Sequence, residues 1–110
     1  MSIVMNLYYT GEKDNAIKFA LEMESSKTAD LIRKSKGNLR YEYFVPVNDE
    51  NTVLLIDEWQ SQDALDRHHA SPVMETILKL RKKYNLTVRA QRYTPDNENI
   101  SAADKEYIEK

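Results

Sequence analysis

The chain has 110 residues, 41% of them hydrophobic, with two glycines, three prolines and no cysteine. This predicts one folded domain with a single core and excludes disulfides, thiolate metal sites and a cysteine nucleophile. Basic and acidic residues are interspersed, 16 against 18, which argues against nucleic acid as a partner. The sequence begins without a signal peptide and contains no apolar run long enough for a membrane span, so we expect a cytoplasmic protein with no membrane attachment.

The first third of the chain predicts a strand followed by a long helix. Residues 3–9 alternate as a strand requires, with apolar or aromatic side chains on both faces, and Thr10-Gly11 ends the strand. Asp14 can cap a helix whose apolar residues recur at three- and four-residue spacing as far as about Ser35. Residues 36–38, Lys-Gly-Asn, then supply basic charge and a residue that tolerates the left-handed conformation, which stops the helix.

The middle of the chain predicts an antiparallel hairpin. Residues 39–47 and 52–59 form the two strands, and the polar residues 48–51 connect them. Apolar side chains again occupy both faces. That pattern is expected of a sheet covered on one side by helices and on the other by a second sheet.

The last elements are two helices and a strand. Ser61 begins a short helix that runs to the two histidines, and Ser71-Pro72 starts another, which Asn85 closes. Residues 86–94 form the final strand. The order β-α-β-β-α-β predicts an α+β subunit of the ferredoxin-like kind with an antiparallel sheet, formed by residues 3–94. Residues 95–110 form a polar tail that is either frayed or docked on a partner subunit.

Two histidines and one tryptophan are the first candidates for chemistry. His68 and His69 are adjacent on a helix, where neighbours diverge by about 100°, so both cannot face one metal and no zinc site is expected. Whichever histidine faces a cavity is the candidate acid or base. Trp59 either lines a ligand cavity or fills the core. Asp57 shares its face and is either buried with a partner or placed at a pocket.

The remaining candidates are an amide and several phenols. Asn6 is a poor strand former within an apolar strand, so its amide either reaches a ligand or satisfies a neighbouring backbone group. Tyr41, Tyr43 and Tyr84 belong to a set of seven tyrosines that can stack on an aromatic substrate or simply pack in the sheet and an interface. The basic run at residues 81–83 falls at a helix C-terminus, where solvated charge complements the dipole.

One stretch of sequence resembles a known family. Residues 57–72 carry an acidic residue, Trp59, the pair Ala64-Leu65, His68 and the pair Ser71-Pro72, and this run resembles the antibiotic-biosynthesis-monooxygenase family. Residues 36–43, Lys-Gly-Asn-Leu-Arg-Tyr-Glu-Tyr, look like the family's glycine-containing entry to its second strand. The resemblance covers about residues 3–94 and leaves the tail outside it.

The resemblance implies a fold, an activity and a site. It implies a ferredoxin-like subunit whose sheet packs against that of a second copy, which makes a dimeric α/β barrel. It implies a monooxygenase without metal or cofactor, acting on a quinol-like or aromatic small molecule that itself supplies electrons to O2. Asn6, Trp59 and His68 match the family's functional positions, and we expect Tyr41, Tyr43, Asp57 and Tyr84 to contact the substrate.

Three functions follow from these expectations. The first is the monooxygenase; the second is an isomerase or lyase that uses His68 as acid and base; the third is a non-catalytic dimeric binding module. Heme breakdown is not expected, because heme-degrading relatives carry a tryptophan and an iron-ligating histidine where this chain has His68 and Leu78.

Overall fold

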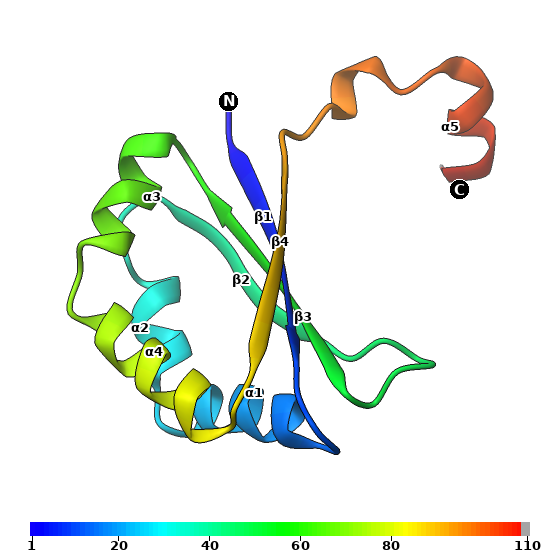
Figure 1. The fold of residues 1–110 in the computed structure, drawn as a ribbon. Coiled ribbons are helices and arrows are strands. Elements are labelled where there is room, and N and C mark those ends of the chain that lie inside the picture. The colour runs from blue at the N-terminus through cyan, green and yellow to red at the C-terminus, as the bar shows by residue number, and fades with distance from the viewer. Residues whose placement is uncertain (109–110) are drawn as a thin grey trace.

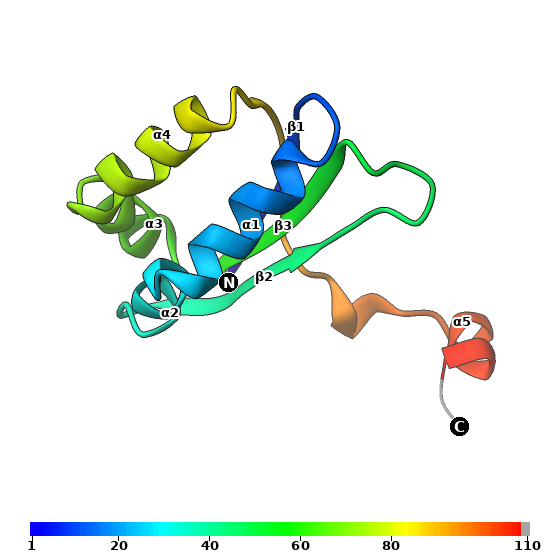
Figure 2. The ribbon, with the colours of Figure 1, turned by 90° about the horizontal axis from the view of Figure 1, so that it is seen from below.

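The computed structural model describes residues 1–108 of the chain. It contains one sheet of four antiparallel strands in the order β2-β3-β1-β4 (Figure 1). The helices α1 to α4 all lie on one side of this sheet (Figure 2). The ferredoxin-like, α+β prediction is confirmed. In chain order the elements are β1 (Ile3–Thr10), α1 (Asn15–Ser25), α2 (Thr28–Arg33), β2 (Asn38–Phe44), β3 (Thr52–Trp59), α3 (Gln62–His69), α4 (Val73–Lys83), β4 (Thr87–Tyr93), the 3-10 turn η1 (Asn97–Asn99) and α5 (Ala102–Ile108).

The single long helix expected up to Ser35 is wrong, because the chain breaks it into α1 and α2. Lys27 stands between them in the left-handed conformation, with φ of 67°. The hydroxyls of Ser26 and Thr28 share a hydrogen bond of 2.8 Å, and short hydroxyl side chains of this kind compete with regular helix. The break lets α2 turn its own apolar side toward the sheet, where Ile32 is fully buried.

The core lies between the helices and one face of the sheet. β1 and β3 pair with Ile3 opposite Trp59 and Tyr9 opposite Val53, and all four side chains are buried on this face. Ser61 caps α3 as predicted, its Oγ accepting from the Ala64 amide. Strand pairing in the hairpin stops at Phe44 rather than at residue 47.

Gly37 brings the start of β2 against α3. Its φ is 90°, in the region that favours glycine, as the sequence predicted for the end of the helical segment. A β-carbon at this position would lie 2.5 Å from the Cβ of Ala64. The glycine therefore allows a close approach that fixes α3, and the histidines it carries, relative to the sheet.

The opposite face of the sheet carries no helix within residues 1–108 (Figure 2). Strand register brings Val4, Asn6, Tyr8, Phe44, Leu54 and Ile56 to this open face, and all are only partly buried. Arg89 and Gln91 of β4 lie on the same face, next to these side chains. So many aliphatic and aromatic side chains are nevertheless unusual for a face in contact with water.

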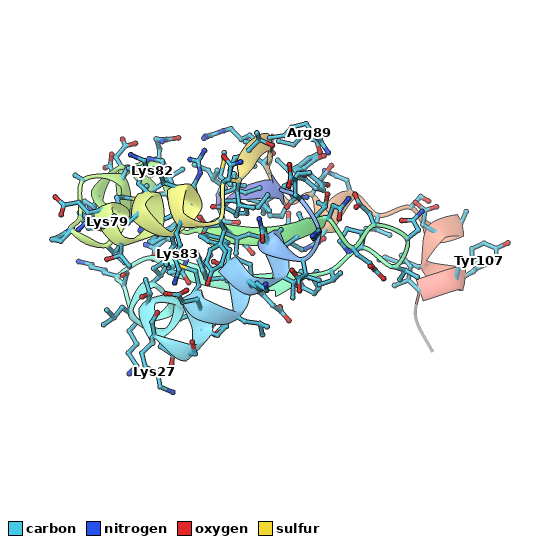
Figure 3. All side chains as sticks on the ribbon, turned by 60° about the horizontal axis from the view of Figure 1, so that its bottom comes forward. Lys27, Lys79, Lys82, Lys83, Arg89 and Tyr107 are labelled. Carbon is cyan, nitrogen blue, oxygen red and sulfur yellow. The ribbon has the colours of Figure 1, made fainter. Side chains whose placement is uncertain are left out.

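The chain leaves the domain after β4. η1 and α5 form an arm that extends away from the sheet (Figure 1), and Tyr107 points outward with 81% of its surface exposed (Figure 3). Residues 109 and 110, the end of the expected tail, lie outside the described residues. Among the described helices, none combines the length and apolarity needed to cross a membrane.

Candidate active site

Trp59 ends β3 and is completely buried, with its indole held by a carboxylate from the same strand face. Its Nε1 donates to Oδ1 of Asp57 at 2.7 Å. Asn38, at the start of β2, donates from Nδ2 to the same oxygen at 3.4 Å. Burial raises the pKa of Asp57 to about 7, although the Trp59 and Asn38 hydrogen bonds favour the charged form and limit the rise. This carboxyl can therefore gain or lose a proton near neutral pH.

His68 covers the other side of the indole. It lies in the last turn of α3, and its imidazole stacks on Trp59 with 4.7 Å between ring centroids and 26° between planes. His68 as a whole is 7% exposed, and its buried Nδ1 has no hydrogen-bond partner. Burial and then the neighbouring His69 lower the pKa of His68 to about 4, so the imidazole is neutral at pH 7. His69 is exposed.

Tyr41 and Tyr43 project from β2 into the same interior. Their hydroxyls lie 3.0 Å apart, and their rings meet edge to face. Burial is the main cause that raises the pKa of both phenols, and the Asp57 charge adds to the effect in each case. The two hydroxyls are therefore neutral donors and acceptors on the helix-covered face of the sheet, as Asp57 is.

Arg81 is a further polar group that sequence reasoning missed. Its Nε is buried without a partner, and its charge works to lower the pKa of Tyr9, a pKa that burial raises to about 12. The expectation that the basic run at 81–83 is solvated is therefore wrong for Arg81. The helical spacing indicates its position, because Arg81 lies one turn after the buried Ile77 on α4 and therefore on the same side of the helix.

Two of the expected site residues lie elsewhere. Asn6 sits on β1 opposite Ile56, on the open face of the sheet, whereas Trp59 belongs to the helix-covered face. Tyr84 donates its hydroxyl to Glu22 and so ties α4 to α1. The structure thus brings together His68, Trp59 and Asp57, with Tyr41 and Tyr43 on the same face, and leaves Asn6 and Tyr84 apart from them.

A pocket opens beside the stacked rings. It has a volume of about 260 Å3, and Trp59 and His68 form part of its wall, together with side chains of α3 and of the segment that links α2 to β2. Within residues 1–108, no group of three or more histidine or acidic side chains is placed to hold a metal ion.

Solved structures of other proteins share this fold. SnoaB, a cofactor-independent oxygenase from Streptomyces nogalater, is 18% identical with a TM-score of 0.66 over 87% of this chain and 94% of its own. A Deinococcus radiodurans protein described as a candidate antibiotic biosynthesis monooxygenase is 17% identical with a TM-score of 0.73, covering 86% and 93% of the two chains. Rv0793 from Mycobacterium tuberculosis is 19% identical with a TM-score of 0.70, covering 90% and 99%. Identities this low establish the fold alone.

Comparison of the sequence with known families identifies the family of this chain. No curated protein matches the chain. The sequence profile described as "Antibiotic biosynthesis monooxygenase" matches residues 1–80, nearly three quarters of the 110 residues, and this segment includes β1 to β3, α3 and most of α4. On that match, the chain belongs to the antibiotic biosynthesis monooxygenase family.

Proposed function

We propose that this chain is a cofactor-independent monooxygenase that acts on a quinol-like or aromatic small molecule bound next to Trp59. The observation that carries the proposal is the buried Asp57–Trp59–His68 arrangement in a chain of this family. An indole fixed by a hydrogen bond at its N–H and by a ring stack on its face forms a rigid part of the pocket wall, beside which an aromatic substrate can bind.

The site contains proton acceptors suited to this chemistry. His68 is neutral at pH 7, but its lowered pKa makes it too weak a base to form a phenolate in advance, so it accepts the phenolic proton as the substrate ring gives up electrons. That ring then reduces O2, so that one oxygen atom enters the ring to give a quinone and the other leaves as water. Asp57 holds the indole in place, and the paired Tyr41 and Tyr43 hydroxyls lie on the same face of the sheet but outside the wall of this pocket.

Oxygen uptake tests this proposal directly. Purified protein is incubated under air with a panel of reduced quinols and naphthols, and uptake is compared with autoxidation in buffer. We expect one substrate to consume O2 with incorporation of one labelled atom from 18O2. His68→Gln should abolish most of the uptake, whereas His69→Gln, which changes the exposed neighbouring histidine, should not. Uptake no faster than autoxidation across the panel would contradict the proposal.

One observation favours a second function: the pKa of Asp57 is raised and that of His68 is lowered, on either side of Trp59. A neutral imidazole and a carboxyl that titrates near pH 7 form an acid and base pair that can move a proton within a substrate without oxygen. Isomerase or lyase activity of this kind would continue under nitrogen. Anaerobic turnover therefore separates the two proposals.

We also propose that a second copy covers the open face of the sheet. Aliphatic and aromatic side chains crowd this face, and the buried Oδ1 of Asn6, in the middle of β1, has no hydrogen-bond partner in its own chain. A symmetric partner would remove the apolar side chains from water and supply a donor to this amide. In this proposal Asn6 contributes to assembly, and the chemistry remains at His68 and Trp59.

A further inference from the structure

The pocket beside the stacked rings has an unusual charge pattern. Its polar wall consists of Ser35, Lys36, Arg67 and Ser71, and it shares the pocket with Trp59 and His68. Two side chains in this wall are cations and none is a carboxylate. The acidic residues of α3, Asp63 and Asp66, do not line the pocket. Fixed charges of one sign in a concave site concentrate ions of the opposite sign.

The two cationic side chains have no acidic partner in the described part of the chain. Neither Lys36 nor Arg67 forms an ion pair within residues 1–108. Basic side chains near helix C-termini often serve the exposed carbonyls of the last turn. Here the serines already do so, because Ser35 Oγ donates to the Leu31 carbonyl at 3.0 Å and Ser71 Oγ donates to the His68 carbonyl at 2.6 Å. The cationic groups therefore remain available to a ligand.

His68 provides a separate indication that the pocket is built for an occupant. Its side chain is more than nine-tenths buried, yet the imidazole Nδ1 makes no hydrogen bond with the protein. Leaving such an atom without a partner costs free energy. His68 lines the pocket, and a polar group of an occupant that reached Nδ1 would break no existing hydrogen bond.

We infer that this pocket is a subsite for an anionic group, a carboxylate or a phosphate, on the small molecule that the site binds. Lys36 and Arg67 pair with the anion, and His68 lies between that anion and the indole of Trp59. At about 260 Å3 the pocket holds one substituent or one ring rather than a whole multi-ring molecule. The identity of the rest of the substrate rests on the proposed function. The binding of the anion does not depend on it.

Binding measured without turnover tests the inference. Backbone amide signals of labelled protein are followed by NMR at pH 7 and constant ionic strength, during titration with sodium benzoate, with inorganic phosphate and with benzyl alcohol as the neutral control. We expect an anion to shift the signals of Lys36, Arg67 and His68, and benzyl alcohol to bind more weakly than benzoate. Stronger binding of benzoate assigns the subsite to an aromatic carboxylate, and stronger binding of phosphate assigns it to a phosphate ester.

Matched variants make the result specific to these two cations. The double change Lys36→Gln with Arg67→Gln should weaken binding of the anion by about tenfold, since two charge-assisted contacts are lost from an exposed site. Lys34→Gln removes one exposed charge from the same segment without touching the pocket and should bind like the parent.

Three results would overturn the inference: no shift with either anion, equal binding of benzyl alcohol and benzoate, or an equal loss in Lys34→Gln. Benzoate binding without any oxygen uptake would leave the subsite standing and remove only the proposed oxygenase reaction.

Discussion

The indole of Trp59 separates two titratable groups whose proton affinities are shifted in opposite ways. Burial disfavours the charged form of each group, which is the carboxylate of Asp57 and the imidazolium of His68. Both groups therefore tend to be neutral in the folded chain at mildly acidic pH. The free energy of unfolding should depend on pH through both groups, with opposite signs.

Asp57→Asn should show the carboxyl's share of this dependence. The unfolded chain ionises Asp57 near pH 4 and the folded chain near pH 7, so the parent loses stability as pH rises between these values. Asparagine keeps an oxygen that can accept from Trp59 Nε1 and cannot ionise. We expect the variant to gain stability relative to the parent as pH rises from 5 to 8, by roughly 1–4 kcal/mol. Urea denaturation at each pH measures the difference, and a difference independent of pH would contradict the shift.

His68→Ala should affect turnover far more than Trp59→Phe does, once an activity has been found. Loss of a general acid or base usually lowers kcat by about a hundredfold or more. Trp59→Phe keeps an apolar ring but loses the N–H that Asp57 accepts, so its effect should fall mainly on KM. Steady-state kinetics on protein with an unchanged circular dichroism spectrum provide the comparison. A His68→Ala enzyme with the parent's kcat would remove this residue from the proposed reaction.

Only part of the candidate site could be anticipated from sequence. The nine-residue spacing of Trp59 and His68 across a strand, a turn and a helix allowed the two rings to meet, and they stack. Asp57 on the Trp59 face followed from strand alternation alone. Asn6 lies on the opposite side of the sheet from Trp59. This depends on the register between β1 and β3, which the sequence of one strand alone does not determine. Asn38 gave no signal, because its contact with Asp57 spans 19 residues.

At the scale of elements, the later helices and the predicted strands agree with the structure, apart from the early end of β2 at Phe44, and the early helical segment does not. Helical periodicity continued across residues 25–28, and nothing in that pattern marks a left-handed Lys27. Glycine and asparagine are common at left-handed positions, and Gly37 and Asn85 both have positive φ here. Lysine is not, so its presence predicts no break. The break became visible only with the backbone conformation.

Gly37→Ala should destabilise the link between α2, β2 and α3. The added β-carbon would meet Ala64 in α3 and require a left-handed alanine, which together should cost about 1–3 kcal/mol. Thermal unfolding measures the loss. Gly11→Ala is the matched control, because the one atom within 3.0 Å of its β-carbon would be the flexible end of the Leu86 side chain, and it should cost less. Equal losses for the two variants would show that the close contact with α3 is unimportant.

At the scale of the whole molecule, the two faces of the sheet differ. Four helices cover one face, and no helix of residues 1–108 covers the other (Figure 2). The strand register places Tyr8, Phe44, Leu54 and Ile56 on this uncovered face. Small antiparallel domains usually place polar side chains on a face that meets water. A single copy therefore leaves its hydrophobic burial incomplete.

Light scattering at micromolar concentration should give the mass of two chains, about twice the 12.9 kDa of one. Leu54→Lys with Ile56→Lys, which places charge in the centre of the open face, should shift the population to single chains. Leu31→Lys with Leu78→Lys alters exposed leucines on the helices and should leave the dimer intact. A parent protein that remains a monomer would contradict this assembly.

Trp59 is the only tryptophan in the chain, and it lies against both His68 and Asp57. All indole fluorescence of this protein therefore comes from the candidate site, without background from other positions. A fully buried indole emits at shorter wavelength than one in water, and a change in the His68 ring or in the neighbouring pocket alters its surroundings directly. The protein thus contains its own optical reporter, with which candidate substrates can be screened by quenching or spectral shift before any reaction is known.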